Sequence, residues 1–285
     1  MSVVYLFPGQ GSQAVGMGQE VLDSYDEYIH KTDDILGYSI KSLCLEDPDS
    51  RLNLTQYTQP ALFVVNSLLF LQKTEETQKK PDFVAGHSLG EYTALFAAGA
   101  FDFETGVRLV QKRGELMAEA TGGGMAAVIG LGADAVRNVL SSSGFDTIDV
   151  ANFNSPSQII VSGPKEDLEK AQPDFEKAGA RRYISLKVSA AFHSRYMSDA
   201  GAKFSEFLDS ISFEDPSIPV ISNVTALPYE KGMIVRNLAQ QMTSSVRWQD
   251  TIEFLLKQPS PEFTEIGPGN VLTKLNQQIV DAEKK

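Results

Sequence analysis

Apolar and polar residues follow one another along the chain in two kinds of pattern, one typical of strands and one typical of helices. Short continuous apolar runs, at residues 2–7 and 82–85, predict buried strands. Longer stretches, among them 89–98 and 104–119, carry apolar residues three and four positions apart and predict helices. Because the two kinds of segment alternate, the pattern indicates an α/β protein with a largely parallel sheet.

The pattern changes at three consecutive glycines, residues 122–124. The next six segments are predicted as strand, helix, strand, strand, helix and strand: 125–129, 134–140, 148–151, 159–161, 165–177 and 183–188. This order is a split ferredoxin-like unit. We therefore predict a large lobe of residues 1–123 and 192–285 and an inserted small lobe of residues 124–191. Such an insertion forms a cleft against its host, where small molecules commonly bind.

Composition excludes several classes of function. A formal net charge of -12 in 285 residues gives no basic surface for nucleic acid. The apolar stretch 61–71 is interrupted by Asn66 and Ser67, which favours a core helix over a membrane span. The only cysteine is Cys44, so no intrachain disulfide forms, as is typical of a reducing compartment. We expect a cytoplasmic protein without a nucleic-acid or membrane partner.

The strongest chemical signal is the motif Gly86-His87-Ser88-Leu89-Gly90, which has the form G-x-S-x-G. It follows a predicted strand and begins a predicted helix, and this is the context that a nucleophilic serine requires. A sharp turn there exposes the hydroxyl of Ser88. The helix amino terminus offers N–H groups and a partial positive charge to an oxyanion.

A serine hydroxyl needs a base, and histidine is the usual one. Of the three histidines, His30 lies in a charged segment and is interpreted as a surface residue. His87 adjoins Ser88 and points to the opposite face, so it supports the turn. His193 is therefore the candidate base, with a buried structural histidine as the alternative. No acidic third member of a triad is identifiable, and a backbone carbonyl could orient the imidazole instead.

Two further segments give weaker signals. Residues 7–13, Phe-Pro-Gly-Gln-Gly-Ser-Gln, follow the first strand, where open α/β sheets place ligands, although by themselves they favour a connecting loop. Arg113 lies on a predicted helix. From the pattern alone, a surface or structural ion pair is the simpler interpretation, and bidentate binding of a substrate carboxylate is the alternative.

Seven segments in order resemble the malonyl-coenzyme A:acyl carrier protein transacylase family, which includes the acyltransferases of fatty acid and polyketide synthesis. The resemblance spans nearly the whole chain. The segments are Phe-Pro-Gly-Gln-Gly-Ser-Gln at 7–13, Thr-Gln-Pro-Ala at 58–61, Gly-His-Ser-Leu-Gly at 86–90, Gln-Lys-Arg-Gly at 111–114, Phe-His-Ser at 192–194, Ser-Asn-Val-Thr at 222–225 and Gly-Pro-Gly at 267–269.

The resemblance implies a role for each matching residue. Ser88 would form the acyl-enzyme, His193 would act as general base and acid, and Arg113 would bind the malonyl carboxylate. The backbone N–H groups of Gln10 and Leu89 would form the oxyanion hole. The resemblance also implies an α/β-hydrolase-like large lobe with an inserted ferredoxin-like small lobe.

Two details of the resemblance concern orientation and selectivity. The family's histidine is oriented by a main-chain carbonyl, which would fall at Ser244 here. Phe192, before the histidine, is similar to malonyl-selective members, because its bulk would crowd an α-methyl branch. Ala190 departs from the common form, in which a histidine often stands at this position, and this leaves the selectivity open.

The resemblance further implies malonyl-coenzyme A and a phosphopantetheinylated acyl carrier protein as partners, and no metal or cofactor besides the coenzyme A thioester. We expect a free-standing monomer that serves a polyketide synthase in trans, because segments 36–40 and 52–61 are most similar to discrete enzymes of that kind. The alternatives are a fatty-acid housekeeping transacylase, a hydrolase that strips acyl groups from carrier proteins, and a silent carrier-binding module.

Overall fold

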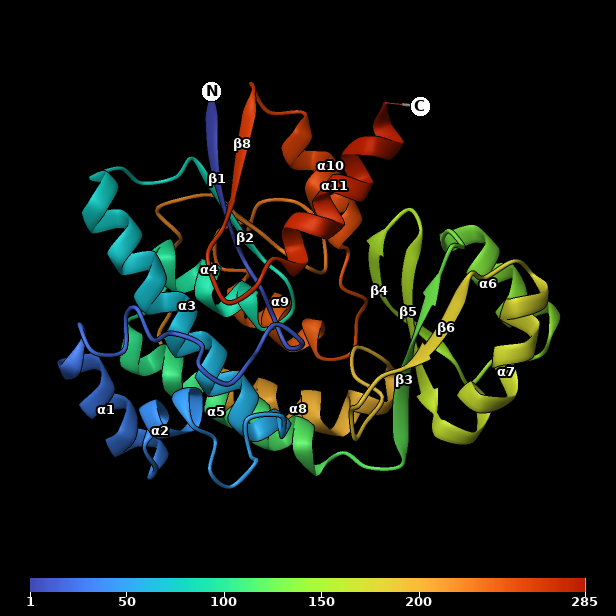
Figure 1. The fold of residues 1–285 in the computed structure, drawn as a ribbon, viewed down its shortest axis with the longest axis horizontal. Helices are drawn as coiled ribbons and strands as arrows, with labels where there is room; N and C mark the ends of the chain where they lie inside the picture. Colours follow the sequence, from blue (N-terminus) through green and yellow to red (C-terminus); the bar gives the residue numbers. More distant parts are fainter. Residues whose placement is uncertain (285) are drawn as a thin grey trace.

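A computed structural model describes residues 1–284 and contains two sheets of different architecture (Figure 1). The first sheet has the strand order β7-β2-β1-β8, and all three strand pairs are parallel. Its strands are β1 (Ser2–Phe7), β2 (Phe83–Gly86), β7 (Val220–Ile221) and β8 (Pro261–Glu265). Parallel strands have their carboxyl ends at the same edge of a sheet, so the segments that follow β1 and β2 lie together there.

Helices cover both faces of this sheet. The helices of the large lobe are α1 (Asp26–Leu36), α2 (Ile40–Leu45), α3 (Thr55–Thr77), α4 (Gly90–Ala97), α5 (Phe103–Glu119), α8 (Ser198–Leu208), α9 (Ile234–Gln241), α10 (Trp248–Leu256) and α11 (Val271–Glu283). The side chains of β1 alternate between the two faces, as the period of a strand requires. Tyr5 and Phe7 enter the core beneath α3, α4 and α5, whereas Val4 and Leu6 enter the core with Trp248 of α10.

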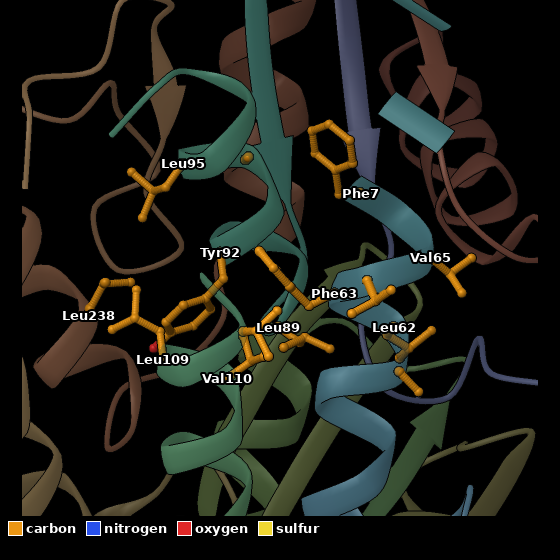
Figure 2. Close-up of a cluster of buried hydrophobic side chains, with 14 of the residues drawn as sticks. Phe7, Leu62, Phe63, Val65, Leu89, Tyr92, Leu95, Leu109, Val110 and Leu238 are labelled. Atoms are coloured by element: carbon orange, nitrogen blue, oxygen red, sulfur yellow. The ribbon is translucent and has the colours of Figure 1, made fainter. Parts of the chain in front are cut away.

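The larger core lies where α3, α4 and α5 meet, and Figure 2 shows Leu62, Phe63, Leu89, Tyr92 and Val110 within it. The apolar stretch 61–71 belongs to α3 and is largely buried, which confirms the prediction of a core helix. Among the described residues, no helix is both long and apolar enough to cross a membrane.

The second sheet is antiparallel, with the strand order β4-β5-β3-β6. Its elements follow in the order β3 (Gly123–Ile129), α6 (Ala133–Ser142), β4 (Asp149–Ser155), β5 (Gln158–Pro164), α7 (Lys165–Lys177) and β6 (Arg182–Ser185). This lobe has its own core, in which Val128, Val136 and Phe175 are buried. The predicted fold class, an α/β large lobe with a parallel sheet and a ferredoxin-like β-α-β-β-α-β unit, is confirmed.

Several predicted strands differ in their bounds from the observed ones. The strands predicted at 148–151 and 159–161 are longer, as β4 and β5, whereas the strand predicted at 183–188 ends at Ser185. The N–H of Leu186 still donates to the Met125 carbonyl of β3 at 2.9 Å, and the chain then runs along the cleft between the lobes, with Leu186 and Val188 in its lining. These two apolar residues alternate as in a strand, but they face the cleft. The helix predicted near 197–208 is confirmed as α8, and a separate 3-10 turn, Arg195–Met197, precedes it.

The two lobes are joined by backbone hydrogen bonds at Val246. Its N–H donates to the Ala151 carbonyl at 2.8 Å, and its carbonyl accepts from the N–H of Phe153 at 2.9 Å. Residues 151 and 153 belong to β4, so a segment of the large lobe pairs with the outer strand of the small sheet. This pairing fixes one side of the cleft.

Candidate active site

Ser88 occupies the sharp turn between β2 and α4. Its φ of +51° lies in the left-handed region, which is costly for a residue with a side chain. The flanking glycines allow the turn to close, because a Cβ atom on Gly86 would lie 1.9 Å from the carbonyl carbon of Gly90. The strand, turn and helix predicted around G-x-S-x-G are therefore confirmed.

The glycine-containing segment after β1 packs directly against this turn. A Cβ atom on Gly9 would lie 2.3 Å from the carbonyl oxygen of His87, and one on Gly90 would lie 2.0 Å from that of Phe7. The N–H of His87 also donates to the Phe7 carbonyl at 3.0 Å. The segment is therefore more than a connection, because its contact with the turn brings Gln10 to the cleft beside Ser88.

A chain of two hydrogen bonds links Ser88 to the end of α9. The Ser88 Oγ atom lies 2.7 Å from His193 Nε2, and His193 Nδ1 lies 2.8 Å from the main-chain oxygen of Gln241. The last carbonyls of a helix have no partner within the helix, so the oxygen of Gln241 is free to accept. The expectation of Ser244 is corrected: the main-chain oxygen hydrogen-bonded to His193 Nδ1 is that of Gln241, three residues earlier.

His193 is held in the neutral form. Burial and, to a lesser extent, the positive charge of Arg113 lower its pKa to about 3. Because a carbonyl oxygen only accepts, Nδ1 carries the ring proton and Nε2 presents its lone pair to the Ser88 hydroxyl. This tautomer is the one that takes a proton from serine.

Arg113 projects from α5 to the same hydroxyl. Its Nη2 donates to Ser88 Oγ at 3.1 Å and to Gln241 Oε1 at 2.9 Å, and its Nη1 donates to Gln59 Oε1 at 2.8 Å. Only 1% of the residue is exposed. Within residues 1–284 no carboxylate lies within 4.0 Å of the guanidinium, and its Nε–H has no acceptor. The site therefore holds a buried cation without a directly bonded counter-ion.

Near Ser88, the backbone N–H groups of Gln10 and Leu89 are available as hydrogen-bond donors, whereas that of Ser88 itself is not. The N–H of Ser88 donates to Asn223 Oδ1 at 2.7 Å and is therefore occupied. In the described part of the chain, the N–H groups of Gln10 and Leu89 donate to no protein acceptor. The side chain of Leu89 lies in the core (Figure 2), and its N–H belongs to the turn directly after Ser88. An oxyanion near Ser88 would find these two donors available.

The cleft around Ser88 has a volume of about 350 Å³ and is lined by both lobes. Phe192 and Arg113 come from the large-lobe side, and Met125 and Ile160 come from the small sheet. His87 faces away from the hydroxyl: its Nε2 lies 2.8 Å from Asn154 Oδ1. His30 is exposed, as predicted.

Three residues of the site were missed by sequence reasoning. The side chain of Gln241 contacts Arg113, Asn223 accepts from the N–H of Ser88, and Glu91 is fully buried in the first turn of α4. Asn223 lies in one of the seven matching segments, and Glu91 directly follows G-x-S-x-G, so both positions carried a signal. Gln241 carried none. Within residues 1–284, no three His, Cys, Asp or Glu residues are grouped to hold a metal ion.

The comparisons with known proteins agree with this geometry. Residues 4–285 match the family described as acyl transferase domain. The chain belongs to this family. A relative from Bacillus velezensis, named polyketide biosynthesis malonyl CoA-acyl carrier protein transacylase BaeC, is 55% identical to this acyltransferase over 97% of the chain and 96% of its own length. The resemblance drawn from the sequence is confirmed.

Solved structures are similar over the whole chain. The malonyl CoA-acyl carrier protein transacylase of Burkholderia pseudomallei has a TM-score of 0.95 and 46% identity, covering 99% of this acyltransferase and 98% of that chain. A complex described as PlMCAT:AntF, a type II PKS acyl-carrier protein with its malonyl-transacylase, contains a chain that matches with a TM-score of 0.94 and 37% identity. That match covers 99% of this acyltransferase and 94% of the chain in the complex.

Proposed function

We propose that this acyltransferase moves a malonyl group from coenzyme A to the phosphopantetheine thiol of an acyl carrier protein. One observation carries the proposal: the Ser88 hydroxyl is bonded both to the neutral imidazole of His193 and to the buried guanidinium of Arg113. The first contact activates a nucleophile, and the second selects an acyl group that ends in a carboxylate.

In the first half-reaction, Ser88 Oγ attacks the carbonyl carbon of malonyl-coenzyme A while its proton passes to His193 Nε2. The oxyanion accepts hydrogen bonds from the N–H groups of Gln10 and Leu89. The carbon–sulfur bond then breaks, and the leaving thiolate takes the proton back from His193. The free carbonyl of Gln241 holds the imidazolium in place, and the negative end of the α9 dipole stabilises its charge.

In the second half-reaction, the phosphopantetheine thiol gives its proton to His193 Nε2. Its sulfur attacks the ester carbon on Ser88, and the carbon–oxygen bond breaks. Ser88 Oγ recovers the proton, so the acyl group leaves as a new thioester and the enzyme is restored. These steps need no metal or cofactor besides the thioester itself.

The preference for malonyl is proposed from Arg113 and Phe192. A planar guanidinium with an unused Nε–H suits a carboxylate, which accepts two parallel hydrogen bonds. The ring of Phe192 lines the same cleft beside His193 and leaves little room for an α-methyl branch. A hydrolase of the same fold has no need of a buried cation at the serine, so Arg113 weighs against that alternative.

The names of the relatives support the partners and the pathway. The Bacillus velezensis relative is named for polyketide biosynthesis, and the PlMCAT:AntF complex pairs a transacylase with an acyl carrier protein. We propose a polyketide role in trans for this chain, in the cytoplasm, with a fatty-acid role as the alternative. We also propose lobe boundaries at 123/124 and 191/192, supported by the separate core of the small lobe.

The test is intact-mass spectrometry of a holo acyl carrier protein mixed with the enzyme and malonyl-, acetyl- or methylmalonyl-coenzyme A. We expect the carrier to gain a malonyl group with wild type and none with Ser88→Ala. A carrier that gains nothing, but loses a preloaded malonyl group to water, would replace this proposal with the hydrolase.

A further inference from the structure

The buried carboxylate of Glu91 has no part in the steps above, although it lies close to them. Glu91 stands in the first turn of α4 and is 0% exposed. Its Oε1 accepts from the Tyr229 hydroxyl at 2.6 Å and from the N–H of Asn223 at 3.1 Å. Its Oε2 accepts from Gln241 Nε2. A buried carboxylate that is bonded only to neutral donors needs a compensating charge nearby.

The compensating charge is Arg113, and Gln241 lies between the two. The amide of Gln241 donates from Nε2 to Glu91 and accepts at Oε1 from Arg113 Nη2 at 2.9 Å. Burial raises the pKa of Glu91 to about 7 and lowers that of Arg113, and the attraction between the two charges opposes both shifts. The two charges therefore form an ion pair separated by one amide.

We propose that Glu91, acting through the side chain of Gln241, is a positioning residue that keeps Arg113 oriented, and free of a directly bonded carboxylate, for the carboxylate of the acyl group. A carboxylate directly on Arg113 would occupy the donors that the substrate needs. The intervening amide supplies compensation and leaves the guanidinium available. This inference rests on the proposed function, because it assumes that Arg113 binds a malonyl carboxylate.

The direction of the Gln241 amide depends on Glu91 being acceptor-only. The N–H of Asn223 is a fixed backbone donor, so residue 91 must present an oxygen to it. In Glu91→Gln the new NH2 group would face Gln241 Nε2, so two hydrogen-bond donors would point at each other. This repulsion is removed only if the Gln241 amide turns over, and the NH2 group of Gln241 would then face the donors of Arg113. Because Gln241 Nε2 also donates to the main-chain oxygen of Ser88 at 3.0 Å, the turned amide disturbs Ser88 as well as Arg113. The effect on Arg113 is therefore measured as a ratio between two substrates that share Ser88.

The readout is the ratio of kcat/KM for malonyl-coenzyme A to that for acetyl-coenzyme A. Both substrates use the same folded enzyme, so partial unfolding cancels from the ratio. We expect Glu91→Gln to lower this ratio about tenfold through the misdirected buried donor. Gln241→Met removes the amide but keeps the main-chain carbonyl for His193, and we expect a similar loss.

Because both residues act through one contact, the double variant should lose no more than either single variant. Glu115→Gln makes the same chemical change on the exposed face of α5 and should keep the wild-type ratio. Arg113→Ala is the positive control and should abolish the preference.

The outcomes separate this inference from the proposed function. If Arg113→Ala keeps the preference for malonyl, the proposed carboxylate site fails, and this inference fails with it. If Arg113→Ala loses the preference while Gln241→Met keeps it, only this inference is overturned, whether or not Glu91→Gln folds. Additive losses in the double variant would also overturn it, because they would mean two independent structural defects.

Discussion

The two walls of the cleft differ in kind. On the large-lobe side, Ser88, His193, Arg113 and Gln241 are linked by hydrogen bonds of 2.7 to 3.1 Å, and three of the four are almost fully buried. On the small-lobe side the wall is formed by apolar side chains such as Ile160 and by neutral amides. The difference indicates that the large lobe carries the chemistry, whereas the small lobe shapes the space in which an acyl group lies.

The largest loss of activity from a substitution in the large-lobe wall is expected at Ser88. Ser88→Ala removes the hydroxyl that, alone among residues 1–284, contacts both His193 and Arg113. Loss of a catalytic serine lowers kcat on the order of 10^6-fold, so we expect no measurable transfer. Labelling with a serine-directed fluorophosphonate measures the same residue directly. Full labelling of Ser88→Ala would mean that another serine is the nucleophile.

Arg113→Ala is expected to have the next largest effect. Truncation of a buried charged donor costs about 2–5 kcal/mol, which corresponds to a loss of about 30-fold to 5,000-fold in kcat/KM for malonyl-coenzyme A. Acetyl transfer should fall much less, because acetyl has no carboxylate. Equal losses for both substrates, measured by carrier mass shift, would assign Arg113 to the serine and not to the acyl group.

The pH dependence of the labelling rate of Ser88 tests the lowered pKa of His193 in the same wall. The pKa of His193 is lowered from 6.5 to about 3, so His193 stays neutral well into the acid range. The rate of fluorophosphonate labelling should therefore hold on acidification and fall only well below pH 6.5. Because Arg113 contributes to this lowering, Arg113→Ala should move the acid limb upward. An unchanged acid limb in Arg113→Ala would contradict the assigned cause.

The smallest effect is expected at Phe192, which only shapes the cleft. Phe192→Ala should leave malonyl transfer nearly intact and admit methylmalonyl about tenfold better, since a pocket discriminates a single methyl group by about that factor. Competition between the two thioesters for one carrier protein measures this directly. A large loss of malonyl transfer would instead give Phe192 a part in holding His193.

Local patterns predicted the elements of the site better than the contacts between them. The turn at Ser88 was predictable because strand, glycines and helix are adjacent in sequence, and His193 followed from the small number of histidines. Arg113 was ambiguous from its helix alone, since burial beside Ser88 depends on the packing of α5 against α4. The Gln241 carbonyl was missed because its availability comes from the end of α9, three residues before Ser244, where the sequence has no stop signal.

The most direct test of the account is peptide mapping of the enzyme after brief incubation with malonyl-coenzyme A and no carrier protein. We predict one malonyl group on the peptide that contains Ser88 in wild type, much less in Arg113→Ala, and release of the group when holo carrier protein is added. A malonyl group on another residue, or one on Ser88 that the carrier does not remove, would contradict the account.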